Sequence, residues 1–171
     1  RKLEENFGSE SGYLGFLRDS PSAAQRLCHV LSNSRFLGDA LNKSVESVTW
    51  LGNDDSLQPR SRESLDIQTK ATLERNAGNI NDFANSIRAM RRHEIERIGL
   101  AWMSGVIDDE ASLAGMTDVY DAAIEASLQW AIQHRINDIQ IDEAPAAIAI
   151  IGMGRYGGRE VNFSSDADVI I

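Results

Sequence analysis

The last twenty residues, GMGRYGGREVNFSSDADVII at 152–171, place a glycine-rich turn close to a pair of aspartates. The first six residues match G-x-G-x-x-G, a dinucleotide-binding pattern, and the apolar run AAIAII leads into them. In a dinucleotide-binding unit the third glycine opens a helix that crosses over to a parallel strand, which takes about a dozen residues or more. Seven residues, REVNFSS, separate Gly158 from Asp166. This spacing argues against hydride-transfer chemistry with NAD.

The two aspartates indicate a different chemistry. Asp166 and Asp168 precede an apolar segment, and on a strand their carboxylates project from the same face because they lie two residues apart. Mg²⁺ is held by one or two carboxylates and completes its shell with substrate phosphates. Gly157 and Gly158 can bring backbone amides close to such phosphates because no side chain intervenes. The order of glycines and aspartates therefore predicts nucleotide phosphate chemistry, with ordinary surface aspartates at a strand start as the alternative.

The residues before this segment show helical patterns. Ser20-Pro21 combines an N-cap residue with a proline at the first helical position, and Ser34 can cap a second helix. Glycine, Asn-Asp and proline predict a loop over TWLGNDDSLQPR, residues 49–60. A long helical segment is expected from 62 to 105 with a break near 76–79, and the acidic residues 108–110 favour the start of another helix.

The pattern changes near residue 144. AAIAII at 146–151 is a short apolar run bounded by Pro145 and Gly152, as expected of a buried strand, and DADVII at 166–171 predicts a second strand. The sequence therefore predicts an α+β fold. A mainly helical bundle over 1–143 is followed over 144–171 by the first two strands of a second domain, which is expected to be truncated.

Charge and composition exclude several classes of protein. The net charge of −9 does not favour nucleic-acid binding, which needs clustered Lys and Arg. No apolar run approaches the roughly 18 residues of a membrane span, and a cytoplasmic location is expected. Cys28 is the single cysteine, which leaves no internal disulfide, and it is predicted to be a small buried side chain.

Four arginines form a basic group on this acidic chain. We expect a solvated helix face with Glu94 and Glu96 as intrahelical partners, while a contact with a substrate or a partner protein is the alternative. The four are Arg88, Arg91, Arg92 and Arg97.

The full tail resembles the signature of the glutamine synthetase adenylyltransferases, members of the nucleotidyltransferase superfamily that includes DNA polymerase β. Proteins of this family are large and bifunctional, with two related nucleotidyltransferase halves. Three helical stretches, SNSRFLGDAL, RAMRRHEIERIGLAWMSG and ASLAGMTDVYDAAIEASLQWA, also resemble the family, so that the resemblance covers about residues 12–171. The matching signature positions are Gly152, Gly154, Arg155, Gly157, Gly158, Glu160, Ser165, Asp166 and Asp168.

The resemblance implies transfer of AMP from ATP to a tyrosine of glutamine synthetase, which regulates nitrogen assimilation. It implies a polymerase-β-like nucleotidyltransferase domain beginning near residue 144. The helical stretch GYLGFLRDSPSAAQRLCHVLSNSRFLGDAL, residues 12–41, looks closer to the C-terminal, adenylylating half of actinobacterial members. The sister half, which removes AMP by phosphorolysis, stays open as an alternative, as does a non-catalytic helical docking or regulatory module. The implied partners are ATP, glutamine synthetase and a PII-type nitrogen-signalling protein.

The resemblance also implies roles for individual residues. Asp166 and Asp168 would be the catalytic residues and hold Mg²⁺ against the phosphates of ATP. The amides of Gly157 and Gly158 would cradle these phosphates. Ser165 would add a hydroxyl beside the carboxylates, and Arg155 would neutralise the pyrophosphate. The site residues named here are Arg155, Gly157, Gly158, Ser165, Asp166 and Asp168.

Members of the superfamily use a third carboxylate on a later strand, which would lie beyond Ile171. We therefore expect the 171 residues alone to be inactive. The measurement is incorporation of radiolabelled AMP into glutamine synthetase with ATP and Mg²⁺. Metal-dependent incorporation by the isolated chain would contradict this expectation.

Overall fold

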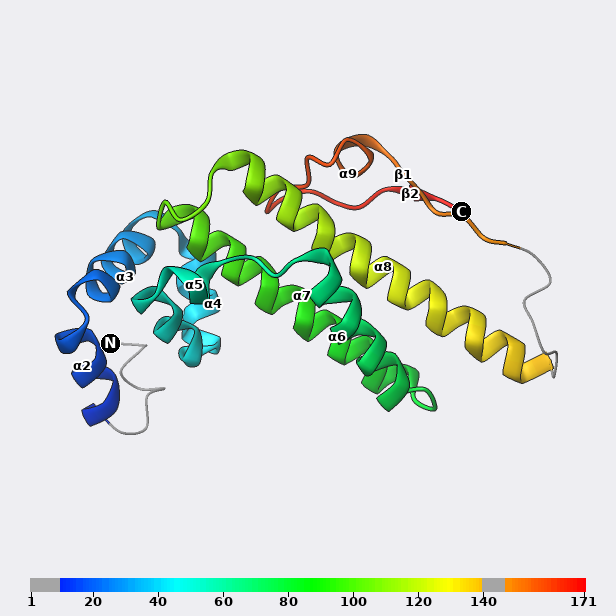
Figure 1. Cartoon of the computed structure of the whole chain (residues 1–171), viewed down its shortest axis with the longest axis horizontal. Coiled ribbons are helices and arrows are strands. Elements are labelled where there is room, and N and C mark those ends of the chain that lie inside the picture. Colours follow the sequence, from blue (N-terminus) through cyan, green and yellow to red (C-terminus); the bar gives the residue numbers. More distant parts are fainter. Residues whose placement is uncertain (1–9, 140–146) are drawn as a thin grey trace. The chain divides into compact units, whose positions relative to one another are not determined.

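The computed structural model describes residues 10–139 and 147–171, and for residues 10–14 and 45 it describes the backbone alone. Over these residues the fold is mainly helical with one two-stranded sheet, which confirms the helical part of the prediction (Figure 1). The chain divides into two compact units, one joining the chain up to Pro59 with Glu96–Ser112 and the other joining Arg60–Ile95 with Leu113–Ile171. The domain boundary expected at 143/144 lies outside the described residues.

The first unit consists of short helices whose starts are marked by polar caps. Ser20 precedes a helix that has Pro21 at its first position, and the Ser34 hydroxyl accepts a hydrogen bond from the Leu37 amide at 3.2 Å. The elements are α2 (Glu10–Asp19), α3 (Pro21–Asn33), α4 (Arg35–Lys43), the 3₁₀ helix η1 (Val45–Gly52) and α5 (Asp54–Leu57). Their core contains Ala23, Leu27, Val30, Leu37, Leu41, Val48, Leu51 and Leu57, with Leu100 and Ala101 of α7 (Ile80–Met103).

The loop predicted over residues 49–60 is wrong for most of its length, because η1 and α5 occupy it. The Asn53 side chain accepts a hydrogen bond from the Asp55 amide at 2.9 Å and caps α5. Leu51 and Leu57 are fully buried. Burial of these two leucines and the cap outweigh the local preference of Asn-Asp for a turn.

Three helices lie side by side in the second unit: α6 (Arg62–Arg75), the first part of α7, and α8 (Asp109–Ile139) (Figure 1). The predicted break near 76–79 is confirmed, since α6 ends before it and the Asn79 side chain accepts from the Asn81 amide at 3.0 Å where α7 begins. The helix start predicted at the acidic residues 108–110 is also confirmed. Asp108 accepts from the Ala111 amide at 2.8 Å and caps α8.

The predicted strands are present in shortened form. In the described part of the chain β1 is Ile151–Gly152 and β2 is Val169–Ile170, and Ala146 of the predicted first strand lies outside it. The two strands pair antiparallel, with Ile151 opposite Ile170 and Gly152 opposite Val169. The predicted burial of the first strand is wrong for the described residues, since Ile148 and Ile151 are exposed, and β2 exposes Val169 and Ile170 as well. A sheet of only two strands is marginally stable in water, which is consistent with strands of two residues each.

Two predictions about burial in the first unit are wrong. Cys28 is exposed, because it lies on the outer side of α3 between the buried Leu27 and Val30. Arg97 is 9% exposed rather than solvated, with its guanidinium carbon 4.0 Å from the centre of the Trp50 ring and a hydrogen bond to the Ser56 carbonyl.

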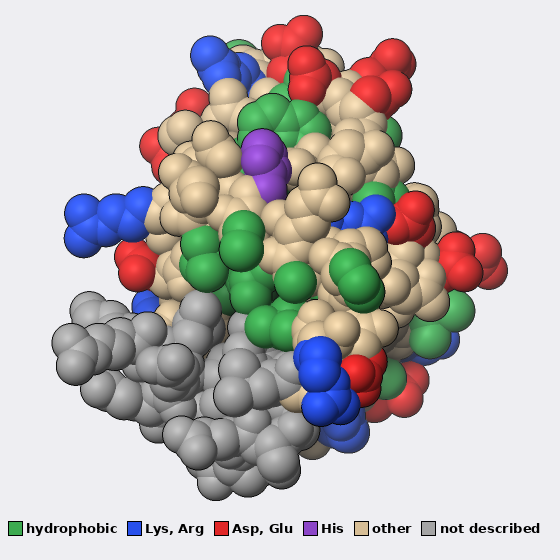
Figure 2. Space-filling view, turned by 90° about the vertical axis from the view of Figure 1, so that its left-hand side faces the viewer, with side chains coloured by type: hydrophobic (Ala, Val, Ile, Leu, Met, Phe, Trp, Pro, Cys, Tyr) green, Lys and Arg blue, Asp and Glu red, His purple; other side chains and the backbone are tan. Residues whose placement is uncertain are grey.

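On the face shown in Figure 2, charged side chains of both signs lie mostly toward the edge of the view while apolar side chains gather nearer the centre. None of the described helices is long and apolar enough to span a membrane.

Glu96 is a buried carboxylate in the first unit, 4% exposed. Burial raises the pKa of Glu96 to about 7, against the lowering effects of the Ser47 hydroxyl and the Arg97 guanidinium, and the Glu46 carboxylate adds to the rise. The folded state therefore binds more protons than the unfolded state between pH 4.5 and about 7. The contribution of Glu96 to the free energy of unfolding therefore falls as the pH rises through this window.

We therefore expect Glu96→Gln to stabilise the protein at pH 8, by on the order of 3 kcal/mol, and to leave its stability nearly unchanged below pH 4.5. Thermal unfolding measured between pH 4 and pH 8 checks this. Glu110→Gln, which changes an exposed carboxylate of α8, is the control. A gain from Glu96→Gln that is the same at both ends of the pH range would contradict the expectation.

Candidate functional site

The pair of predicted metal-binding aspartates lies directly before β2 rather than on it. Asp166 and Asp168 are both exposed, and Ala167 between them is half-buried. The Asp168 carbonyl accepts a hydrogen bond from the Met153 amide at 2.8 Å, which extends the β1–β2 pairing by one bond. This bond fixes the backbone of Asp168 beside the start of the glycine-rich turn. The structure thus brings together the two parts of the signature.

The glycine-rich turn forms one short helix, α9 (Gly154–Gly157). Within it the Gly157 amide donates to the Met153 carbonyl at 2.9 Å and the Gly158 amide donates to the Gly154 carbonyl at 3.0 Å. An amide that already donates within the turn can offer a phosphate no more than a shared hydrogen bond. Binding of phosphate by these two amides therefore stays a prediction.

Close packing of the backbone explains why Gly157 is a glycine. A Cβ atom on Gly157 would lie 2.3 Å from the Gly152 carbonyl oxygen. On Gly158 the nearest atom would be the Gly154 carbonyl oxygen at 3.4 Å, an ordinary contact. The left-handed conformation in this turn is adopted by Gly154, with φ 54°, and by Arg159, with φ 58°. Close packing therefore requires a glycine at position 157 but not at position 158.

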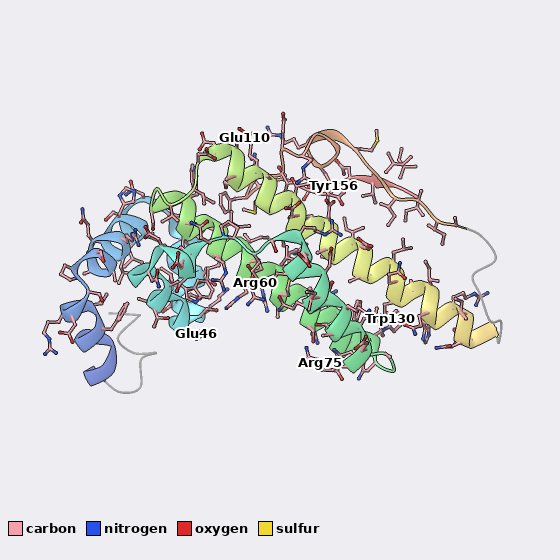
Figure 3. The ribbon with its side chains drawn as sticks, viewed as in Figure 1. Glu46, Arg60, Arg75, Glu110, Trp130 and Tyr156 are labelled. Atoms are coloured by element: carbon pink, nitrogen blue, oxygen red, sulfur yellow. The ribbon has the colours of Figure 1, made fainter. Side chains whose placement is uncertain are left out.

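Tyr156 attaches the turn to α8. Its side chain is 8% exposed, and its hydroxyl donates to the Asp121 carboxylate at 2.6 Å. Burial and then the hydrogen bond to Asp121 raise the pKa of Tyr156. Figure 3 shows Tyr156 between the C-terminal segment and the α8 ribbon. A hydrogen bond from a buried donor to a charged acceptor contributes about 1.5–3 kcal/mol, so this contact is a strong attachment.

Acidic residues of α8 hold further parts of the second unit through two arginines. Arg159 donates to Asp118 at 2.7 Å and lies 3.6 Å from Asp121, while Arg62 of α6 lies 3.4 Å from Asp121 and 2.5 Å from Glu125. Sequence reasoning missed this network. The spacing of Asp118, Asp121 and Glu125, which puts all three on one side of a helix, was the available signal.

The other predicted site residues lie around the same turn and the next one. Arg155 is exposed in α9. Ser165 is half-buried, and its hydroxyl donates to the Asn162 side chain at 2.9 Å and accepts from the Asn162 amide at 3.1 Å. Ser165 therefore closes the turn that precedes Asp166. A hydroxyl held in this way positions the aspartate backbone, whereas a contact with substrate stays a prediction.

A cavity of about 780 Å³ opens between α7, α8 and the residues that follow Ser165, wholly within the second unit. Its size falls in the usual range of ligand pockets, about 300–1,000 Å³. One end is aromatic, with the rings of Phe83 and Trp130 stacked 5.9 Å apart. Asp166 and Arg91 line the cavity as well. Among the described residues no group of three or more His, Cys, Asp or Glu side chains is placed to hold a metal ion.

The two adjacent glycines allow a matched test of the turn. We expect Gly157→Ala to open the turn, because the new methyl group would collide with the Gly152 carbonyl, and Gly158→Ala to be tolerated because its backbone is helical, with φ −81°. Hydrogen exchange should show amides of residues 156–160 exchanging at least about tenfold faster in the first variant, which corresponds to about 1.4 kcal/mol of local stability. Equal exchange in the two variants would refute the steric explanation.

The comparisons with known proteins agree with the resemblance of the signature. The family described as glutamate-ammonia ligase adenylyltransferase matches residues 24–171. A protein of Bifidobacterium longum (strain DJO10A), named bifunctional glutamine synthetase adenylyltransferase/adenylyl-removing enzyme, is 74% identical over 171 residues, which is 100% of this chain and 16% of that protein. No solved structure matches the chain.

More distant relatives carry the same name. The proteins of Leifsonia xyli subsp. xyli and Mycobacterium leprae are 38% and 37% identical, each over 99% of this chain. The chain spans 16% and 17% of the length of these two relatives. The match to the family covers far more than half of the chain, and the identity to the Bifidobacterium protein extends over all of it. The chain therefore belongs to the glutamate-ammonia ligase adenylyltransferase family.

Proposed function

We propose that this chain supplies the metal-binding aspartates of an enzyme that transfers AMP from ATP to a tyrosine of glutamine synthetase. The relatives are named for adenylylation of glutamine synthetase and its reversal, so glutamine synthetase is the protein substrate in this proposal. One observation carries the assignment of the site. The hydrogen bond from the Met153 amide to the Asp168 carbonyl joins the aspartates to the glycine-rich turn in a chain that belongs to this family.

The residues present suit Mg²⁺. Asp166 and Asp168 offer two exposed carboxylates two residues apart in the segment before β2, and Mg²⁺ prefers oxygen ligands while keeping positions for water and phosphate. The bond from Met153 holds the backbone at Asp168, which reduces the entropy that the segment would lose on binding the ion. Bound Mg²⁺ would neutralise charge on the phosphates of ATP. We also propose that β1, α9 and β2 are part of a polymerase-β-like nucleotidyltransferase domain.

The proposed reaction forms a bond between the tyrosine oxygen and the α-phosphorus of ATP and breaks the bond from that phosphorus to the bridging oxygen, which leaves with pyrophosphate. The proton of the tyrosine hydroxyl is released to the solvent. Asp166 and Asp168 would hold the Mg²⁺ that orients the triphosphate and neutralises its charge. In this proposal Arg155, which is exposed in the glycine-rich turn, neutralises the departing pyrophosphate. Ser165 holds the turn before Asp166, and the amides of Gly157 and Gly158 stay candidates for phosphate contacts.

The name of the relatives covers two opposite activities, and we propose the adenylylating one for the half to which this chain belongs. The helical stretch over residues 12–41, which looks closer to that half, supports the choice. Phosphorolytic removal of AMP is the alternative activity, and a non-catalytic docking module is the alternative class. Docking of a PII-type nitrogen-signalling protein and a cytoplasmic location stay predictions.

Replacing either aspartate tests the site. We expect Asp166→Asn and Asp168→Asn, each made in the complete protein, to lower AMP transfer to glutamine synthetase by at least about 100-fold, because the loss of a metal ligand removes several kcal/mol of charge stabilisation. Adenylylation and AMP removal are assayed separately with the same protein. The activity that is lost identifies the half to which this chain belongs.

Asp138→Asn is the matched control, since Asp138 is an exposed carboxylate of α8 that lies 3.6 Å from His134 and does not line the cavity. This variant should keep both activities. If neither activity falls in Asp166→Asn and Asp168→Asn, the catalytic assignment is wrong and the docking-module alternative gains support.

A further inference from the structure

Two arginines of α7, Arg88 and Arg91, line the same 780 Å³ cavity as Asp166. Arg88 is exposed and Arg91 is half-buried. Both belong to the basic group that the sequence predicted to be a solvated face. The cavity therefore brings positive charge from the helical part of the chain to the aspartate that the proposed function assigns to Mg²⁺.

The guanidinium of Arg91 has an unusual environment. Its central carbon lies 5.4 Å from the centre of the Tyr120 ring, a cation–π contact. Its Nε atom is buried and donates to no acceptor among the residues that the structure describes. A buried donor that stays unpaired costs about 1–3 kcal/mol, and such groups in folded proteins usually have a water molecule, an ion or a ligand as partner.

Tyr120 connects Arg91 to the segment of the aspartates. Its hydroxyl lies 3.5 Å from the Ser165 carbonyl, to which it donates, and Asp166 follows Ser165 directly. One face of the Tyr120 ring thus lies against the guanidinium while the hydroxyl end touches the turn before Asp166. The contact with the ring restricts Arg91 and lowers the entropy that its long side chain would lose on binding an anion.

The chemistry of these lining residues selects the ligand. A guanidinium pairs most strongly with carboxylates and phosphates, which accept two parallel hydrogen bonds. A free anion would be repelled by the Asp166 carboxylate, but a phosphate can share a divalent cation with that carboxylate. A phosphoryl group coordinated to Mg²⁺ would therefore share the cation with the Asp166 carboxylate and accept a hydrogen bond from the unpaired Nε of Arg91.

We propose that Arg91 binds a phosphoryl group of the substrate in this cavity, whose wall also contains Asp166. The inference rests on the proposed function and adds to it a binding residue from α7. Arg88, at the exposed rim, adds positive charge that attracts the anion. The phosphoryl group belongs either to the triphosphate of ATP or to free inorganic phosphate, and these two sources give different results in the test.

The test compares Arg91→Gln with Arg92→Gln in the complete protein. Arg92 is the adjacent residue of α7, is exposed and does not line the cavity, so its variant removes the same charge without touching the site. Isothermal titration calorimetry measures dissociation constants for ATP, pyrophosphate and inorganic phosphate, each with Mg²⁺. We expect Arg91→Gln to weaken binding about 10- to 100-fold, the value of a hydrogen bond to a charged group, and Arg92→Gln to change it by less than about twofold.

Binding of the three probes distinguishes the two sources of the phosphoryl group. Weaker binding of ATP and pyrophosphate in Arg91→Gln assigns the cavity to the triphosphate, while weakening confined to inorganic phosphate assigns it to the free anion. Unchanged binding of all three probes, or equal losses in the Arg91 and Arg92 variants, overturns the inference. Arg91→Lys keeps the positive charge and loses the Nε donor, so it should bind at an intermediate strength and serves as the test if Arg91→Gln does not fold.

Asp166→Asn separates this inference from the proposed function. If Asp166→Asn abolishes the Mg²⁺ dependence of ATP binding while Arg91→Gln has no effect, the metal site stands and the role of Arg91 is wrong. If Arg91→Gln weakens binding of the phosphate probes and neither Asp166→Asn nor Asp168→Asn changes it, Arg91 binds the anion and the assignment of the metal is wrong.

Discussion

The hydrogen bond from the Tyr156 hydroxyl to the Asp121 carboxylate is the contact on which the position of the signature depends. The segment from Ile151 to Ile170 contains two strands of two residues each and one short helix, which cannot hold their own conformation in water. Their position must come from α8. The 2.6 Å bond joins a buried phenol to a charged acceptor and is therefore worth more than the ion pairs around it.

The ion pairs around Tyr156 fix the conformation of the turn but add little to the free energy that holds it on α8. Arg159 is about half exposed, and a pair of that kind contributes roughly 0–1 kcal/mol. Its backbone is left-handed, which costs a residue with a side chain roughly 1–2 kcal/mol. The pair with Asp118 and the bond from the Arg159 amide to the Tyr156 carbonyl together offset part of this cost. They select one conformation for the turn rather than adding net stability.

Holding the turn on α8 also shapes the cavity. The same helix presents Asp121 to the turn and Tyr120 to the guanidinium of Arg91, so adjacent residues serve the signature and the cavity wall. Farther along α8, Trp130 stacks on Phe83 and closes the aromatic end, near the turn between α6 and α7 (Figure 3). A change in the attachment of the turn would therefore move Asp166 relative to the arginines of α7.

The sequence by itself determined the family, the helix starts at Pro21 and Arg35, the break before Ile80 and the residues of the signature, because each depends on residues close together in the chain. Spacing alone also excluded a crossover helix between Gly158 and Asp166. Only the tertiary structure decided that Arg97 is buried, that η1 and α5 replace a loop, and that Asp121 holds Tyr156. The cavity that Arg91 and Asp166 both line likewise joins residues far apart in sequence. Local patterns carry no information about such contacts, which arise from the packing of α7 and α8 in the second unit.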